Sequence, residues 1–453
     1  MRAQITGAST RLSRKPRIPL LLGAQTAFNL SFYAVVPFIA LVLAQKFELS
    51  ATAVGMVLGI RTFAQQGMFL VGGALADYFG GRRIFLVGIT VRVLGFTALA
   101  LGTAVTSTIP GVALAIFVAG TVFTGLGGAL FSPALNLYIA QADQQRAAEG
   151  TTAVNGRTTL FAWLNVTGEI GAVLGPLLGY SLIDHGFTLV AVVGAAVFIL
   201  LWGIFWFLLP DTQQDASGDV SISTAGSTPG GVLAQSSMIF SRILAVVKNR
   251  GFTRFAALHS VDLFCYNQLY FALPLIAAAV QDSHKVLAAA FAAISVVVLV
   301  GQVPISYLSS KFSVATTLRV GYCISALGLL ILGAAQWNTA DTAPVFLESI
   351  GSPTLIITGA LLIGAGHLLV SPQALSHVSI HTPTHAKAAY LGFIATCGGI
   401  AVLLGNFVVG SVLDIVADAF PAAQPLVWVA AALVITLAAS LQRPLNHRDF
   451  DLQ

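Results

Sequence analysis

The sequence predicts an all-α membrane protein with twelve transmembrane helices in two six-helix bundles. Of its 453 residues, 57% are hydrophobic and 9% are charged, and the mean hydropathy is +0.88. Soluble domains contain roughly 25% charged residues, so this composition belongs in a bilayer. The apolar stretches between the charged clusters are long enough to cross about 30 Å of hydrocarbon as helices. We expect spans at 18–46, 52–76, 84–106, 110–139, 155–183, 187–209, 253–279, 285–309, 315–336, 353–379, 388–414 and 423–441.

One long polar segment divides these spans into six plus six. Its core, DTQQDASGDVSISTAGSTPGG, lacks aromatic residues and is typical of a flexible linker. The first apolar run is too long for the core of a signal peptide, so we expect it to be retained. The predicted parts are a cytoplasmic tail at 1–17, a bundle at 18–209, a cytoplasmic linker at 210–250, a second bundle at 251–441 and a cytoplasmic tail at 442–453.

The basic residues indicate the orientation of the chain. With the N-terminus inside, all but four of the 22 Lys and Arg residues fall in inner segments or near the inner ends of spans; Lys46 and Lys285 lie at outer ends, and Arg61 and Arg92 lie deeper within spans. This bias predicts that both termini are cytoplasmic, and the short loops favour a prokaryotic inner membrane. Because the topology explains the net charge of +5, no nucleic-acid partner is expected. The three cysteines are far apart in sequence and suggest no disulfide framework.

Two internal matches indicate that the chain arose by duplication. GLGGALFSP at 125–133 returns 239 positions later as GAGHLLVSP at 364–372, in the fourth span of each half. GEIGAVLGPLLGYSLID at 168–184 aligns without gaps to GGIAVLLGNFVVGSVLD at 398–414, in the fifth span of each half. A weaker third match pairs ALADYFG at 74–80 with YLSSKFS at 307–313. Two equivalent halves can rock about a midplane site and expose it alternately to each side.

The loop between the second and third spans carries a family resemblance. GGALADYFGGRR at 72–83 resembles the signature loop of the major facilitator superfamily, which reads approximately G-x-L-x-D-R-x-G-R-R/K. Tyr78 replaces the usual Arg. The resemblance covers essentially the whole chain, and it implies two pseudo-symmetric bundles, each made of two inverted three-helix repeats. It also implies that Asp77 helps to latch the outward-open state; the alternative is a solvated acid in a loop that only sets topology. The matching residues are Gly73, Leu75, Asp77, Gly80, Arg82 and Arg83.

The fifth span combines a packing face with an acid. Gly171, Gly175, Pro176 and Gly179 resemble the glycine-proline figure of the antiporter branch, the 12-helix drug:proton antiporters. Glycines four residues apart allow close helix packing, and ordinary transmembrane packing is the alternative reading. Glu169 falls with Thr158 and Asn165 on the opposite side of the helix. An intramembrane acid is a functional hypothesis by default, so we expect Glu169 to carry protons or to form an ion pair with Arg61.

A second intramembrane acid lies in the seventh span. His259, Asp262, Tyr266 and Tyr270 follow helical spacing and form one polar-aromatic stripe. The resemblance implies that the first helix of each three-helix repeat lines the central cavity. Asp262 is then expected to carry the coupling proton, with His259 tuning it, or to attract a cationic substrate; a structural Asp–Tyr cluster is the alternative. Further cavity candidates are Gln25, Asn29, Tyr33, Asn136, His367 and Gln373.

The fourth span departs from the pattern of the exporters. Where many have an R-x-x-Q-G figure, this chain has Thr121 and Thr124. Arg92 in the third span either supplies the missing charge or extends to the headgroups, and we favour the second interpretation. His377, His381 and His385 are spaced for metal ligands, but Pro383 interrupts the helix and no cysteine accompanies them, so no metal site is expected.

These observations predict a secondary active transporter. No G-x-x-x-x-G-K-[ST] loop occurs, so neither ATP nor another cofactor is expected to drive transport, and the proton gradient is the expected energy source. No nucleophile–base constellation indicates an enzyme. We expect a monomer in the lipid bilayer that exports small amphiphilic compounds in exchange for protons. The alternatives are a proton-coupled uptake symporter or facilitator of a small metabolite, and a membrane sensor without transport.

Overall fold

A computed structural model describes residues 18–148, 160–209, 246–309, 311–339, 349–382 and 387–443 of the chain. In this part of the chain, eleven segments are long and apolar enough to cross a membrane, and α9 with α10 makes a twelfth crossing, which confirms the predicted number. The helices are α1 (Ile18–Gln45), α2 (Ala51–Gln66), α3 (Phe69–Phe79), α4 (Gly81–Ala104), α5 (Pro110–Ala148), α6 (Leu160–Ile183), α7 (Phe187–Leu208), α9 (Arg250–Asn267), α10 (Ala272–Ala277), α11 (Ser283–Ser309), α12 (Val314–Thr339), α14 (Ser352–His381), α15 (Lys387–Ala419) and α16 (Leu426–Leu441), with a 3₁₀ turn at Pro421–Ala423.

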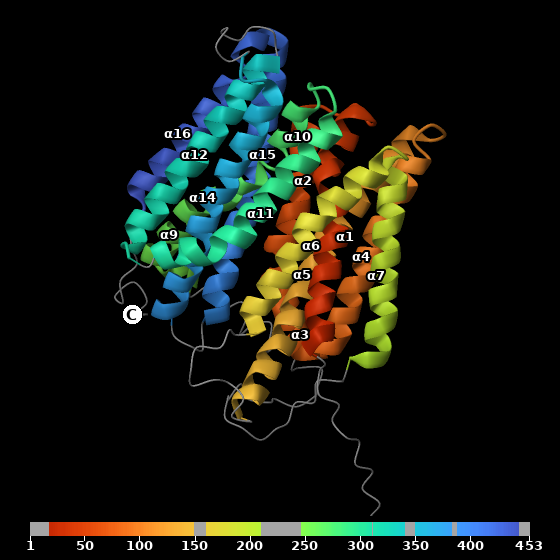
Figure 1. Cartoon of the computed structure of the whole chain (residues 1–453), viewed down its shortest axis with the longest axis vertical. Helices are drawn as coiled ribbons and strands as arrows, with labels where there is room; N and C mark the ends of the chain where they lie inside the picture. Colours follow the sequence, from red (N-terminus) through yellow and green to blue (C-terminus); the bar gives the residue numbers. More distant parts are fainter. Residues whose placement is uncertain are drawn as a thin grey trace, which may run out of the picture.

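The helices form two bundles that stand side by side (Figure 1). Helices α1 to α7 make the N-terminal bundle, coloured red to yellow-green, and α9 to α16 make the C-terminal bundle, coloured green to blue. Successive spans alternate in direction, so Ile18 and Leu441 lie at one end of the molecule, which we call the terminal end. The other end, where α1 ends and α2 begins, is called the opposite end.

The predicted duplication is visible in the packing of α4 on α5 and of α12 on α14. A Cβ atom at Gly95 would lie 3.1 Å from the carbonyl oxygen of Gly120, and a Cβ atom at Gly328 would lie 2.8 Å from that of Gly359. Gly95 and Gly328 are equivalent positions of the two halves, as are Gly120 and Gly359. The same backbone contact therefore holds the third and fourth spans of each half together, as small residues allow in membranes.

Two predicted spans are interrupted rather than continuous. The second span is divided into α2 and α3 by a turn at Gly67 and Met68, where the Gly67 carbonyl accepts a hydrogen bond from Thr396 Oγ1 at 3.4 Å. The seventh span is divided into α9 and α10 at residues 268–271. Pro274 explains this second break, because it lacks an amide hydrogen and its ring excludes the carbonyl of Tyr270 from a helical position.

The two bundles meet along two seams, α2 against α15 and α6 against α11. The α2–α15 seam reaches the opposite end of the molecule, where α2 begins. There the Asp414 carboxylate of α15 accepts hydrogen bonds from the backbone nitrogens of Ala51 and Thr52, both at 2.9 Å, and from Thr52 Oγ1 at 2.6 Å. The acid thus caps the N-terminus of α2, where the helix dipole favours negative charge. At the same end of the molecule, the rings of Phe38 on α1 and His284 on α11 lie 6.0 Å apart. These contacts join the bundles at the opposite end.

Replacing Asp414 with Ala should loosen that end, because the first amides of α2 lose their acceptor. Loss of a helix cap typically costs about 0.5–2 kcal/mol. We expect faster hydrogen exchange at Ala51 and Thr52, measured by mass spectrometry on the purified protein. Asp418→Ala is the matched control, since Asp418 lies exposed one turn further along α15. We call the contact of Asp414 with Ala51 and Thr52 the clasp. Equal hydrogen exchange in the Asp414 variant and the native protein would show that the clasp does not hold this end together.

Candidate functional site

A cavity of about 320 Å³ lies between the two bundles. Its walls come from α1 and α6 of the N-terminal bundle and from α9, α11 and α14 of the C-terminal bundle. Part of the lining comes from the halves of α6, α11 and α14 that lie nearer the terminal end of the molecule, namely Asn165, Gln302 and Pro372. The cavity therefore extends from the middle of the molecule toward the terminal end. The other lining residues are Tyr33, Glu169, Ala172, Tyr266, Phe291, Ile294, Ser295, Val298, His367, Leu368 and Ser371.

Glu169 brings a carboxyl group from the N-terminal bundle into this cavity. It lies on α6 one turn after Asn165, and it lines the same cavity as His367 of the C-terminal bundle. Among the described residues no ion pair joins Glu169 to Arg61; Arg61 Nη2 instead donates to Gln65 Oε1 at 3.0 Å. Thr158 lies outside the described residues.

A buried histidine–aspartate pair forms the facing wall. His367 Nδ1 lies 2.8 Å from Asp262 Oδ2, which joins α14 to α9. The Asp262 side chain is 4% exposed, while that of His367 is 27% exposed and reaches the cavity. The imidazole stacks on the Tyr266 ring, with centroids 4.1 Å apart. His367 therefore stands between the cavity and a carboxylate that solvent does not reach.

His259 forms no hydrogen bond with Asp262 among the described residues, and its tuning of that carboxylate stays a prediction. His259 Nδ1 lies 3.0 Å from the hydroxyl of Tyr322 on α12, and its ring stacks on Phe255 at 5.9 Å. Helical spacing correctly placed His259 and Asp262 on one helix, but the hydrogen bond to Asp262 comes from another span. The polar stripe is thus divided between the wall of the cavity and the interior of the C-terminal bundle.

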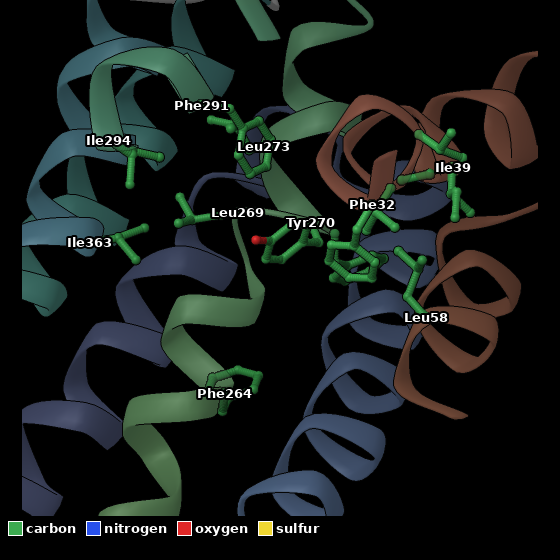
Figure 2. Close-up of a cluster of buried hydrophobic side chains, with 14 of the residues drawn as sticks. Phe32, Ile39, Leu58, Phe264, Leu269, Tyr270, Leu273, Phe291, Ile294 and Ile363 are labelled. Atoms are coloured by element: carbon green, nitrogen blue, oxygen red, sulfur yellow. The ribbon is translucent and has the colours of Figure 1, made fainter. Parts of the chain in front are cut away.

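Tyr270 lies behind the cavity wall rather than in it. The residue falls in the break between α9 and α10, is 6% exposed, and packs against Phe291 at 5.2 Å. Figure 2 shows its ring between Phe32 of the N-terminal bundle and Leu269 of its own segment. Tyr270 therefore fills the contact between the bundles next to the cavity.

The glycine face of α6 packs on α1. A Cβ atom at Gly171 would meet the carbonyl of Thr26, and one at Gly175 would lie 2.7 Å from Tyr33 Cβ. At the same seam Asn29 Nδ2 donates to the Gly168 carbonyl at 2.9 Å, and Gln25 Nε2 lies 3.5 Å from Asn29 Oδ1. Gln25 and Asn29 thus pack in the contact between α1 and α6 and do not line the cavity. Pro176 and Gly179 continue the same helix, and Gly179 approaches the carbonyl of Ala34.

Replacing Gly171 with Ala should destabilise this seam, because the added methyl group has no room against the α1 backbone. Overpacking typically costs about 1–3 kcal/mol. We expect a lower melting temperature for the purified variant. Gly23→Ala on α1 is the control, since a Cβ atom there meets nothing within 4 Å. Identical melting temperatures for both variants would show that the seam tolerates the methyl group.

The expectation that Arg92 extends to the headgroups is wrong. The residue is 0% exposed, and its guanidinium group lies over Phe28 at 4.3 Å and over Phe32 at 4.6 Å. Gly127 and Gly128 on α5 leave the space through which the side chain enters the bundle. Sequence position alone could not tell whether this long side chain turned outward to lipid or inward.

The remaining candidates are spread along the molecule. Gly80 has φ +89° between α3 and α4, a conformation that favours glycine. Arg82 Nη2 donates to the Trp206 carbonyl at 2.6 Å, and Arg83 is exposed. Gly73 faces Pro133 at 3.9 Å, and the Asp77 side chain lies outside the described part. Asn136 is exposed and does not line this cavity. Gln373 donates to Ser309 at 2.8 Å, and the rings of His377 and His381 lie 4.4 Å apart, whereas His385 is not described.

A buried amide network between the bundles was not expected from the sequence. Asn267 Nδ2 donates to Thr62 Oγ1 at 3.0 Å, Asn406 Nδ2 to Asn267 Oδ1 at 2.9 Å, and Gln268 Nε2 to Asn406 Oδ1 at 3.0 Å. All four residues are at least 95% buried. The network ties α2 to α15 and to the break after α9. Its only sequence signal was the adjacent amides of Asn267 and Gln268 within an apolar span.

The sequence comparison identifies the family. Residues 21–406 match the family model of the Major Facilitator Superfamily, and the chain belongs to this family of membrane transporters. It is 30% identical over 398 residues to an uncharacterized MFS-type transporter of Mycobacterium tuberculosis H37Rv, covering 87% of this chain and 85% of that protein. It is also similar to the multidrug resistance protein MdtH of Photorhabdus laumondii, with 33% identity over 171 residues, 38% of each chain.

The structural comparison agrees on the fold. A crystal structure of a POT family transporter in complex with 5-aminolevulinic acid superimposes with a TM-score of 0.70 over 94% of each chain, at 14% sequence identity. The protein is therefore an integral membrane transporter with a small-molecule substrate, and its two bundles are those of the superfamily.

Proposed function

We propose that this transporter exports small amphiphilic compounds in exchange for protons by alternating access. The observation that carries the proposal is the arrangement of Glu169 on one bundle opposite the His367–Asp262 pair on the other, in one cavity. Intramembrane acids that face a cavity mark pathways for ions and protons. The apolar side chains of Phe291, Ile294 and Val298 in the same walls suit the hydrophobic part of a substrate.

Rocking of the bundles would couple the two movements. Glu169 and His367 belong to different bundles, so a change of access alters the distance between them and with it the affinity of the carboxyl group for a proton. The α1–α6 seam would stay closed within the N-terminal bundle, because the Gly171 and Gly175 contacts are internal to it. No cofactor beyond the proton gradient is needed in this scheme.

Export rather than uptake is supported by two features. The glycine-proline figure at Gly171, Gly175, Pro176 and Gly179 resembles that of the antiporter branch, and the MdtH relatives are named multidrug resistance proteins. With both termini in the cytoplasm of a bacterial cell, as the Lys and Arg distribution favours, the cavity would open toward the cytoplasm and the clasp at Asp414 would lie outside. The segment at 210–250 would then be a cytoplasmic linker between the bundles.

Inverted membrane vesicles test this function. A fluorescent lipophilic cation and a neutral fluorescent drug are offered to vesicles with an acidic interior, with and without a protonophore. We expect accumulation that depends on the protein and collapses with the protonophore. Accumulation driven only by an acidic exterior would contradict export, as would the absence of any dependence on the gradient.

A further inference from the structure

Two buried arginines of the N-terminal bundle surround one aromatic ring. Arg61 on α2 is 4% exposed and Arg92 on α4 is 0% exposed. Their guanidinium carbons lie 4.9 Å and 4.6 Å from the centroid of Phe32, and Arg92 also lies over Phe28 at 4.3 Å. An uncompensated buried charge costs several kcal/mol, of which cation–π contacts of about 0.5–2 kcal/mol each return only a part. The cluster thus holds two positive charges in an apolar setting.

Most of the hydrogen-bond donors in this cluster are unused. Nε, Nη1 and Nη2 of Arg92 and Nε of Arg61 have no hydrogen-bond partner among the residues that the structure describes. Neither arginine is in an ion pair within that part of the chain. Arg61 Nη2 is the exception, with its hydrogen bond to Gln65. Since buried donors are almost always satisfied, the cluster lacks an acceptor, and a negatively charged one would also balance its charge.

The cluster lies directly behind the cavity wall. The Phe32 ring packs edge-on against the Tyr33 ring, with centroids 5.1 Å apart, and Tyr33 lines the cavity. In the internal repeat Gly128 is the counterpart of His367, the cavity histidine of the other bundle. A Cβ atom at Gly128 would lie 2.5 Å from Arg92 Nη2. The Arg92 guanidinium group therefore lies where a side chain at position 128 would begin, and the equivalent position of the C-terminal bundle carries the His367 imidazole.

We propose that Arg61 and Arg92 form a binding site for one monovalent anion, which enters from the cavity past Tyr33. The ligand is a single negative group that accepts hydrogen bonds from the unpartnered Nε, Nη1 and Nη2 of Arg92 and Nε of Arg61. Chloride and a small carboxylate share this chemistry. The site is independent of the exporter function proposed above, because both arginines belong to the N-terminal bundle and neither Glu169 nor Asp262 takes part.

The test measures thermal unfolding of the purified full chain in detergent. Chloride or acetate is titrated against gluconate at constant sodium concentration, so that ionic strength stays fixed. A ligand that binds only the folded state raises the melting temperature saturably, and we expect a rise of about 2 °C or more. Arg92→Met should abolish the rise. Arg319→Met, a change of an exposed arginine on α12, should leave it intact.

A second variant guards against a folding defect in Arg92→Met. Gly128→Ala keeps both charges but displaces the guanidinium group, and it should reduce the rise, whereas Gly111→Ala on the same helix meets nothing within 4 Å and should not. A larger rise with chloride assigns an inorganic anion, and a larger rise with acetate assigns a carboxylate. The site is refuted if neither anion acts on the native protein, or if Arg92→Met and Gly128→Ala both respond fully. The exporter proposal would still stand in that case, because gradient-driven accumulation in vesicles tests it separately.

Discussion

Glu169→Gln is expected to abolish accumulation of substrate against its concentration gradient, while exchange of substrate at equal pH on both sides of the membrane stays intact. The amide keeps the shape of the side chain but cannot release a proton, so the cavity loses the group proposed to carry it. We expect gradient-driven flux to fall at least about tenfold, which corresponds to about 1.4 kcal/mol. The measurement compares uphill uptake with substrate counterflow in proteoliposomes.

Glu48→Gln is the control for this variant, because Glu48 lies exposed in the loop after α1. Loss of both uphill flux and counterflow in Glu169→Gln would instead assign the residue to substrate binding or to folding. Uphill flux at the native rate would remove Glu169 from the coupling scheme.

Asp262→Asn is expected to impair coupling through His367. The carboxylate is buried and holds the imidazole at 2.8 Å, so its loss leaves a cavity histidine without the charge that orients it. We expect gradient-driven flux to fall about tenfold or more in Asp262→Asn and in His367→Gln. Because the two residues act as a unit, the double variant should be little worse than either single one.

The double-variant cycle separates this role from a structural one. Independent effects of the two substitutions, multiplying to a hundredfold loss, would contradict a coupled pair. Asp282→Asn in an exposed loop is the control. Size-exclusion chromatography of each purified variant shows whether the fold is retained.

The spans were predictable because hydrocarbon thickness dictates their length and composition. The structure ends α16 at Leu441, the residue predicted to end the last span. The break after α9 was harder to foresee, because prolines also occur inside continuous helices here, as Pro133 does in α5. Local sequence reports a proline's missing donor but not whether neighbouring helices satisfy the freed carbonyls.

The candidate site was predictable one helix at a time and not across helices. Helical spacing placed Glu169 and the glycines on different sides of α6. In the structure the glycines pack against α1, and Glu169 lines the cavity. Asp262 and His367 are 105 positions apart, and no periodicity within either span indicates their contact. For Arg92 the decisive features were Gly127 and Gly128 on another helix, which open the bundle to its side chain.

Proton movement in proteoliposomes of known orientation tests the central claim most directly. A pH-sensitive dye inside the vesicles follows protons while a panel of lipophilic cations and neutral drugs is added under an imposed pH gradient. The account predicts substrate-dependent proton flux opposite to the substrate, which Glu169→Gln abolishes. Proton flux in the same direction as the substrate would make the protein an importer and contradict the account.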